Sequence, residues 1–391
     1  MDLLPTSLGT RPRLALEIRP EGVVAARAED AAAQVTAVAY GELAPGAVLP
    51  GLKHGNLVNR AAVVAAVRKA LEAVMLRERQ TSLVLPDAAV RVLLLDFDTL
   101  PPKPVEALPV VRFRLKKLLP FDPDDAAVSY QVMSSAKGMV RVVAVAVPRE
   151  VLAEYEGVVR EAGFEPGAVL PSTLAALSGL GDDEESTLVV NAGDSSVTTA
   201  IVQGNVLLLH RMVDFAAEGV EIAPPVVAAV APAIPQELLA LPLVDVESSS
   251  AEWTMQQPVA GYGVLDDDHI SAEANVQARR LREEIEREFA YEAPSAEPVS
   301  VRSAGVAREV TQAVSVATAY FEDTLQRAPG TVLAAGSLAA ETLGGMIAEA
   351  GFSEQEVRVR AMFDASMLAA GATTTRAPMG WLAGVRGALR S

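Results

Sequence analysis

The sequence contains no cysteine among its 391 residues. That absence excludes disulfide bonds, thiolate metal ligands and a cysteine nucleophile. Histidine is almost as rare, and His54, His210 and His269 are too widely separated to form a metal-ligand motif. We therefore predict that the protein holds no metal centre of its own.

The common sequence signatures of catalysis are missing as well. The chain has no GxxxxGK[ST] phosphate loop, no GxGxxG dinucleotide motif, no HExxH and no GxSxG. Ser195 and Ser196 follow a glycine, but no histidine lies close to them in the sequence as an activating base. We predict no catalytic residue.

Basic residues are in deficit, because 33 Lys and Arg face 50 Asp and Glu, for a net charge of −17. This balance excludes the broad basic face that nucleic-acid binding requires. The longest apolar stretch, 226–244, is interrupted by three prolines, so we expect no membrane-spanning helix. The N-terminus lacks the basic start and apolar core of a secretory signal. We expect a soluble, cytoplasmic protein that does not insert into a membrane directly.

What the sequence does contain is a duplication. Two fifteen-residue units, LALEIRPEGVVAARA at 14–28 and LVVNAGDSSVTTAIV at 188–202, align without a gap, and Glu17 falls opposite Asn191. Each unit has the pattern of a strand, a tight polar turn and a second strand, and another β-prone run follows each. The duplication indicates two similar lobes that face a cleft.

Local patterns predict several further elements. Asn59 can cap a helix that runs to about Arg79, and residues 110–119 have the pattern of a helix preceded by prolines. Residues 128–133 and 139–147 alternate as an antiparallel pair of strands. Further helices are expected over 272–290, over 308–326 and after a Ser337 cap, with a strand over 331–334.

Four phrases carry a more specific signal. They are VRFRLKKLLPFDPDDAAVSYQV at 111–132, AVAVPREVLAEYEGVVREAGFEPGAVLPSTLAAL at 144–177, LVVNAGDSSVTTAIVQGNVLLLHR at 188–211 and EVTQAVSVATAYFEDTL at 309–325. With the order of the elements, they make the chain resemble the PilM family of type IV pilus assembly proteins. That family belongs to the actin-like superfamily and is related to FtsA.

The resemblance implies an α/β, actin-like (ribonuclease H-like) fold of two lobes with duplicated β-meander domains. On that basis the first lobe spans 12–180 and carries an added subdomain at about 88–147. The second lobe spans 187–365 and contains an insertion at 222–305. Residues 366–391 return to the first lobe.

Members of this family bind ATP between the lobes, so the resemblance implies ATP and Mg as cofactors. Carried over by motif, the phosphate-facing turns are 17–22 and 191–196, and the adenosine-side turn runs from Ala335 to Ser337. Phosphate turns need glycine amides that approach the phosphate closely and a carboxylate that orients hydrated Mg²⁺. The candidate nucleotide-binding residues are Glu17, Arg19, Gly22, Asn191, Gly193, Asp194, Ser195, Gly336 and Ser337.

All three turns depart from the family pattern. The family has Asp-x-Gly in both phosphate turns and a glycine run at the adenosine turn, where this chain has Glu-Ile-Arg, Asn-Ala-Gly and Ala-Gly-Ser. Arg19 suits either contact with a phosphate or a place inside the cleft beside an acidic residue. We expect little or no hydrolysis; the alternative is an active Mg-ATP-binding ATPase of pilus or cell-division machinery.

The resemblance also implies a partner. PilM-like proteins hold the N-terminal cytoplasmic tail of the inner-membrane protein PilN in a groove of the first lobe, alongside other pilus assembly components. The basic cluster at 112–117 suits such docking, although a solvated helix face is the alternative. The candidate partner-binding residues are Arg112, Phe113, Arg114, Lys117, Phe121 and Tyr130. Such an adaptor would be cytoplasmic and would reach the inner membrane through its partner.

Overall fold

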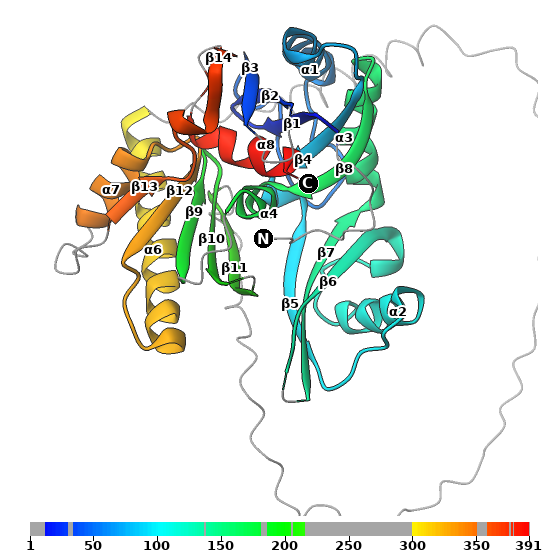
Figure 1. Ribbon diagram of the computed structural model, residues 1–391, viewed down its shortest axis with the longest axis vertical. Helices are drawn as coiled ribbons and strands as arrows, with labels where there is room; N and C mark the ends of the chain where they lie inside the picture. The colour runs from blue at the N-terminus through cyan, green and yellow to red at the C-terminus, as the bar shows by residue number, and fades with distance from the viewer. Residues whose placement is uncertain are drawn as a thin grey trace, which may run out of the picture. The chain divides into compact units, whose positions relative to one another are not determined.

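The computed structural model describes residues 12–29, 34–136, 138–180, 186–204, 206–215, 299–349, 358–374, 377 and 379–390. Most of the predicted insertion at 222–305, including the helix expected over 272–290, lies outside the described residues. The described part forms two large sheets and one small sheet, with helices between and beside them (Figure 1).

The sheet of the first lobe has six strands in the order β14-β3-β2-β1-β4-β8. The first three strands in sequence form an antiparallel meander, and β4 and β8 continue the sheet in parallel with β1. The last strand in sequence pairs in parallel with β3. The strands are β1 (Leu14–Arg19), β2 (Gly22–Ala28), β3 (Val35–Glu42), β4 (Gln80–Leu85), β8 (Glu165–Pro171) and β14 (Leu368–Thr374).

The sheet of the second lobe repeats this arrangement with five strands in the order β11-β10-β9-β12-β13. Glu17 pairs with Val24 across the first hairpin, and Asn191 pairs with Thr198 across the second, so both pairs are seven residues apart. The alignment of the two units is therefore confirmed, and the two sheets agree with the predicted α/β fold of duplicated meanders. The strands are β9 (Thr187–Ala192), β10 (Ser196–Gln203), β11 (Val206–Asp214), β12 (Thr331–Gly336) and β13 (Arg358–Ala361).

Helices α1 (Arg60–Val74) and α3 (Arg149–Glu161) cover one face of the first sheet. Their apolar residues, spaced by three or four, form a buried core with the alternate residues of β1 that point to the same side. On the second sheet, α6 (Val299–Leu325) and α7 (Ala340–Glu349) bury an equivalent apolar face. The helix expected over 308–326 is thus confirmed, whereas α7 begins three residues after the Ser337 that was expected to cap it.

Two short helices, α4 (Ser172–Ser178) and α8 (Leu382–Leu389), pack against each other and share one buried core with residues of both large sheets (Figure 1). Close approach depends on Gly387, because a Cβ there would overlap the Ala175 carbonyl of α4. Three-residue 3₁₀ turns are present at η2 (Asp87–Ala89), η7 (Ala365–Met367) and η8 (Met379–Trp381), and η8 leads directly into α8. The domain boundaries drawn from the sequence stay predictions.

The third sheet, in the order β5-β7-β6, forms an added unit within the first lobe, with α2 beside it (Figure 1). Its antiparallel hairpin confirms the pair of strands expected at 128–133 and 139–147. The helix differs from expectation, since it begins at Pro104 and contains Pro109 in its second turn. Its elements are β5 (Arg91–Phe97), α2 (Pro104–Leu115), η3 (Pro123–Asp125), β6 (Ala126–Ala136) and β7 (Met139–Pro148).

The predicted cap of the first long helix is confirmed and can be tested. The Asn59 side chain accepts a hydrogen bond from the Ala62 amide at 3.1 Å. We expect Asn59→Ala to lower the free energy of unfolding by about 0.5–2 kcal/mol, because an amide of the first turn loses its partner. Urea unfolding measures this loss. Asn59→Ser, which retains a capping oxygen, is the control and should retain most of the stability.

Candidate functional site

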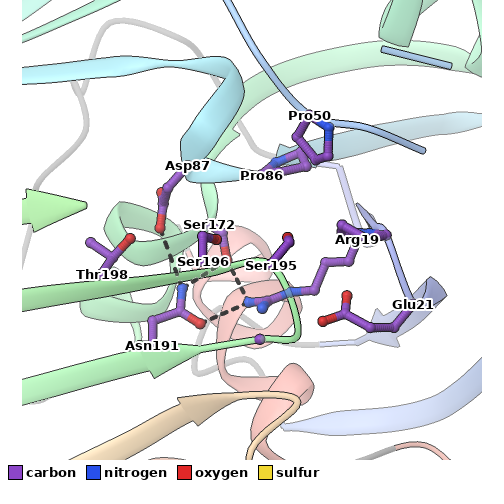
Figure 2. A pocket seen from close by; sticks show the side chains of 12 residues that line it. Arg19, Glu21, Pro50, Pro86, Asp87, Ser172, Asn191, Ser195, Ser196 and Thr198 are labelled. Atoms are coloured by element: carbon purple, nitrogen blue, oxygen red, sulfur yellow. Dashed lines mark hydrogen bonds between the residues drawn. The ribbon is translucent and has the colours of Figure 1, made fainter. Parts of the chain in front are cut away.

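The candidate site lies where the β1–β2 turn of the first lobe meets the β9–β10 turn of the second. The duplicated hairpins bring Arg19 of one lobe close to Asn191 of the other (Figure 2). Glu17, two residues before Arg19, pairs with it. The start of α4 adds Ser172 between them. The structure thus brings together candidate residues that are more than 170 positions apart in the sequence.

Arg19 is the centre of this site. Its Nε donates to Glu17 Oε1 at 2.6 Å, and its Nη2 donates to Ser172 Oγ at 2.7 Å and to Asn191 Oδ1 at 2.9 Å. Glu17 is fully buried, and Arg19 is 8% exposed. The guanidinium lies 5.6 Å from the centre of the Trp381 ring. Of the two roles open to Arg19 from the sequence, the structure shows the pairing with an acidic neighbour.

The burial of Glu17 and Arg19 and their mutual attraction shift the pKa values of both groups. Burial raises the pKa of the Glu17 carboxyl, and the charge of Arg19 and the hydrogen bond from Ser172 offset only part of that increase. Burial would lower the pKa of Arg19, but the negative charges of Glu17 and Glu21 outweigh it and raise that pKa overall. Arg19 is therefore a fixed positive charge inside the cleft.

Asn191 connects this pair to the rest of the cleft floor. Its Nδ2 lies within hydrogen-bond distance of Thr173 Oγ1 at 2.9 Å and Ser172 Oγ at 3.0 Å. Asp87 in turn accepts hydrogen bonds from the amide and the hydroxyl of Thr173. Both polar atoms of the Asn191 side chain, which stands where the family pattern has a carboxylate, therefore already have hydrogen-bond partners within the protein.

Little space remains in this part of the cleft. The cavity lined by Arg19, Asp87 and Asn191 has a volume of about 20 Å³, which is close to the space of a single water molecule. A larger cavity of about 340 Å³ lies beside it. The carboxylates of Glu21, Glu42, Asp194 and Asp214 line it, and its described lining includes no Lys or Arg.

The residues present do not fit a Mg-nucleotide in this arrangement. The Gly193 amide donates to the Ser196 carbonyl and closes the hairpin, and the Asp194 amide donates to the Glu21 carboxylate. These two backbone donors of the turn are therefore occupied. Within the described ranges, no group of three or more His, Cys, Asp and Glu side chains is arranged to hold a metal ion.

The remaining candidate nucleotide residues serve the backbone or line the cavities. Gly22 allows close pairing with β3, since a Cβ there would lie 2.6 Å from the Gly41 carbonyl oxygen. Gly336 has a φ of 92° and packs directly on Ala192, which no larger residue would permit. Ser195 lines both cavities. The Ser337 hydroxyl donates to Glu21 at 3.1 Å.

Sequence reasoning missed five contributors to the site. Glu21 lies inside the predicted phosphate-facing turn at 17–22, but it is not among the nine candidate nucleotide-binding residues. Asp87 follows the end of β4 and so marks the edge of the sheet that faces the cleft, which is a usable signal. Ser172 and Thr173 begin α4 in the PSTLAAL phrase, whereas nothing local to Trp381 indicates its place. The five residues are Glu21, Asp87, Ser172, Thr173 and Trp381.

The predicted partner-binding residues are divided by the structure into two groups. Phe113 is 72% exposed, and Arg114 and Lys117 are exposed beside it. Arg112 instead donates to the backbone carbonyls of Pro123 and Ala126, and so holds the end of α2 against the start of β6. Phe121 is half-buried, and Tyr130 packs against the core between α2 and the small sheet.

An apolar pocket of about 150 Å³ lies on another side of the added unit, and we name it the β6–β8 pocket. Both strands are at the edges of their sheets. Leu152 of α3, residues of β7, Leu85 of β4 and Val90 complete the lining. Of the six predicted partner-binding residues, Tyr130 alone is adjacent in sequence to this lining. Its main contributors are Ala127, Ser129, Leu152, Val169, Leu170 and Pro171.

No protein-family model matches the chain, and no curated protein matches it. Among solved structures, it is similar over 97% of its length to 98% of a chain from the PilM-PilN type IV pilus biogenesis complex, with 16% identity and a TM-score of 0.60. It is also similar to the ethanolamine utilization protein EutJ from Carboxydothermus hydrogenoformans, with 10% identity, coverage of 100% and 94%, and a TM-score of 0.41. The first similarity confirms the resemblance to PilM at the level of the fold.

No helix in the described part of the chain combines the length and the apolar character needed to cross a membrane.

Proposed function

We propose that this chain is an adaptor of type IV pilus assembly that holds the N-terminal cytoplasmic tail of a PilN-like inner-membrane protein. It would then be cytoplasmic and peripheral to the inner membrane through that partner. The shared fold with a chain of the PilM–PilN complex supports this proposal.

The observation that carries the proposal is the β6–β8 pocket. An extended tail can add to the edge of a sheet through its backbone while alternate side chains enter pockets beside it. Here two edge strands border one apolar pocket in the first lobe, which is the lobe expected to hold the tail. We infer that the pocket anchors an apolar side chain of the tail.

The test is a binding measurement with the tail peptide by fluorescence anisotropy. We expect Ala127→Arg to weaken binding at least about tenfold, because the long cationic side chain fills the pocket with a charge that has no partner there. Ala136→Arg places the same side chain at the exposed end of the same strand and should bind like the wild type.

The exposed residues of α2 and the segment that follows it, which includes Phe121, provide the competing location. Alanine at Arg114 or at Phe121 tests it directly in the same assay, since neither residue lines the β6–β8 pocket. Loss of binding in those variants, with normal binding by Ala127→Arg, would move the tail site to α2. Normal binding by all three variants would remove both locations, and a wild-type chain that does not bind the tail peptide would remove the adaptor role.

A further inference from the structure

Glu21 crosses the cleft from the first lobe to the second. It lies on the β1–β2 turn, and its Oε1 accepts hydrogen bonds from the Asp194 amide at 2.8 Å and from the Ser337 hydroxyl at 3.1 Å. Those donors belong to two separate turns of the second lobe, after β9 and after β12. One carboxylate oxygen of Glu21 therefore joins three turns, because its two donors lie 173 and 316 residues after Glu21 in the sequence.

The β9–β10 turn is shaped for an anion, and the anion it receives is Glu21. A Cβ on Gly193 would lie 2.7 Å from Glu21 Oε1, so a larger residue there would displace the Glu21 carboxylate from this position. The same turn directs a backbone amide at the carboxylate oxygen. A glycine next to a backbone amide donor is the combination that lets a turn bind a phosphate or a carboxylate.

The surroundings favour an internal anion over a soluble one. Arg19 supplies one buried positive charge, which Glu17 and Glu21 already share. Burial and the charges of Glu42 and Glu21 raise the pKa of the Tyr40 hydroxyl in the adjacent cavity, which reflects a negative potential there. A phosphate entering past these carboxylates would be repelled and would find its donors occupied.

We propose that Glu21 is an intramolecular ligand of the phosphate turn, which occupies the anion position in place of a nucleotide and holds the two lobes together without one. This proposal concerns the cleft alone and stands or falls independently of where the tail binds.

Backbone amide exchange in the full chain tests the contact directly. We expect exchange at the Asp194 amide to be about tenfold faster or more in Glu21→Ala, because a charge-assisted hydrogen bond is lost. Glu42→Ala is the matched control, since it removes one carboxylate from the same cavity without touching the donors. Unchanged exchange in Glu21→Ala, or an equal increase in Glu42→Ala, would overturn the proposal.

Thermal unfolding tests the anion site itself. We expect sodium phosphate, compared with sodium chloride at equal ionic strength, to raise the Tm of Glu21→Ala and not that of the wild type or of Glu42→Ala. MgATP should leave the wild-type Tm unchanged. The assignment would be contradicted if phosphate did not raise the Tm of Glu21→Ala. It would also be contradicted if MgATP raised the Tm of the wild type.

A second variant covers a failure of Glu21→Ala to fold. Glu21→Gln keeps the shape and an acceptor oxygen but makes the hydrogen bond neutral, so exchange at Asp194 should still be about threefold faster. Exchange in Glu21→Gln at the wild-type rate would equally reject the role of Glu21 as an anionic ligand.

Discussion

Replacing Arg19 with methionine is expected to lower the free energy of unfolding by about 3–5 kcal/mol. The variant leaves the fully buried Glu17 carboxylate without its positive partner, and it also removes hydrogen bonds to Ser172 and Asn191. A buried charge that loses its partner is among the most destabilising changes in a protein. Urea unfolding followed by circular dichroism measures the loss.

A control and a double variant separate pairing from packing. Arg160→Met removes a surface pair with Glu156 and should cost no more than about 1 kcal/mol. Combining Arg19→Met with Glu17→Leu removes both buried charges, so the double variant should be more stable than Arg19→Met alone. A double variant that is less stable than Arg19→Met would show that pairing with Glu17 is not the cause of the loss.

The loss in Arg19→Met should also depend on pH. Burial already raises the pKa of Glu17 above its ordinary value of 4.5, and removal of the arginine raises it further. A group whose pKa is raised in the folded state stabilises the protein below the unfolded pKa and loses that effect as the pH rises. The variant should therefore be less impaired near pH 4.5 than near pH 7.5, and equal impairment at both would contradict a buried carboxylate.

Replacing Trp381 with alanine is expected to cost about 3–5 kcal/mol of unfolding free energy. The side chain is fully buried and sits edge-on to Tyr40, with ring centres 5.5 Å apart, while Arg19 lies against its face. It belongs to the core that α8 shares with both large sheets. Its loss would open a cavity beside the cleft and leave Arg19 without that contact.

Two further variants define what Trp381 contributes. Trp381→Phe should lose less than half as much stability, because an aromatic ring remains and the indole nitrogen has no hydrogen-bond partner among the described residues. Met379→Ala, at a neighbouring position that is 40% exposed, should be close to neutral. Thermal and urea unfolding measure these losses. Equal destabilisation of Met379→Ala and Trp381→Ala would contradict the role given to Trp381.

A substantial part of the fold was predictable from local patterns. The two hairpins, the Asn59-capped helix and the β6–β7 pair depend on apolar periodicity and turn residues within short windows, which is where sequence signals are strongest. The start of α2 was wrong by several residues. Pro109 suits the first turn of a helix, but the core contacts of Ala107, Val111 and Leu115 extend the helix through it.

The candidate site was predictable in part. Glu17, Arg19, Asn191 and Gly193 were identified because the duplicated units place them at equivalent turn positions. Their roles were not predictable, since a glycine beside an amide suits a phosphate and a carboxylate equally well. The choice between those anions depends on Glu21, which is 173 residues away from Asp194 in the sequence.

The sequence by itself determined that the chain contains two related hairpins, because period-two strands and polar turns are local properties that recur at both, and the actin-like fold was implied by the resemblance to the PilM family. The tertiary structure alone decided what lies between the lobes. Only the packing of α4 and α8 between the two sheets brings Ser172 and Trp381 to Arg19, and Glu21 to the turn of the other lobe. Contacts of that kind follow from the geometry of distant elements, for which no local periodicity carries a signal.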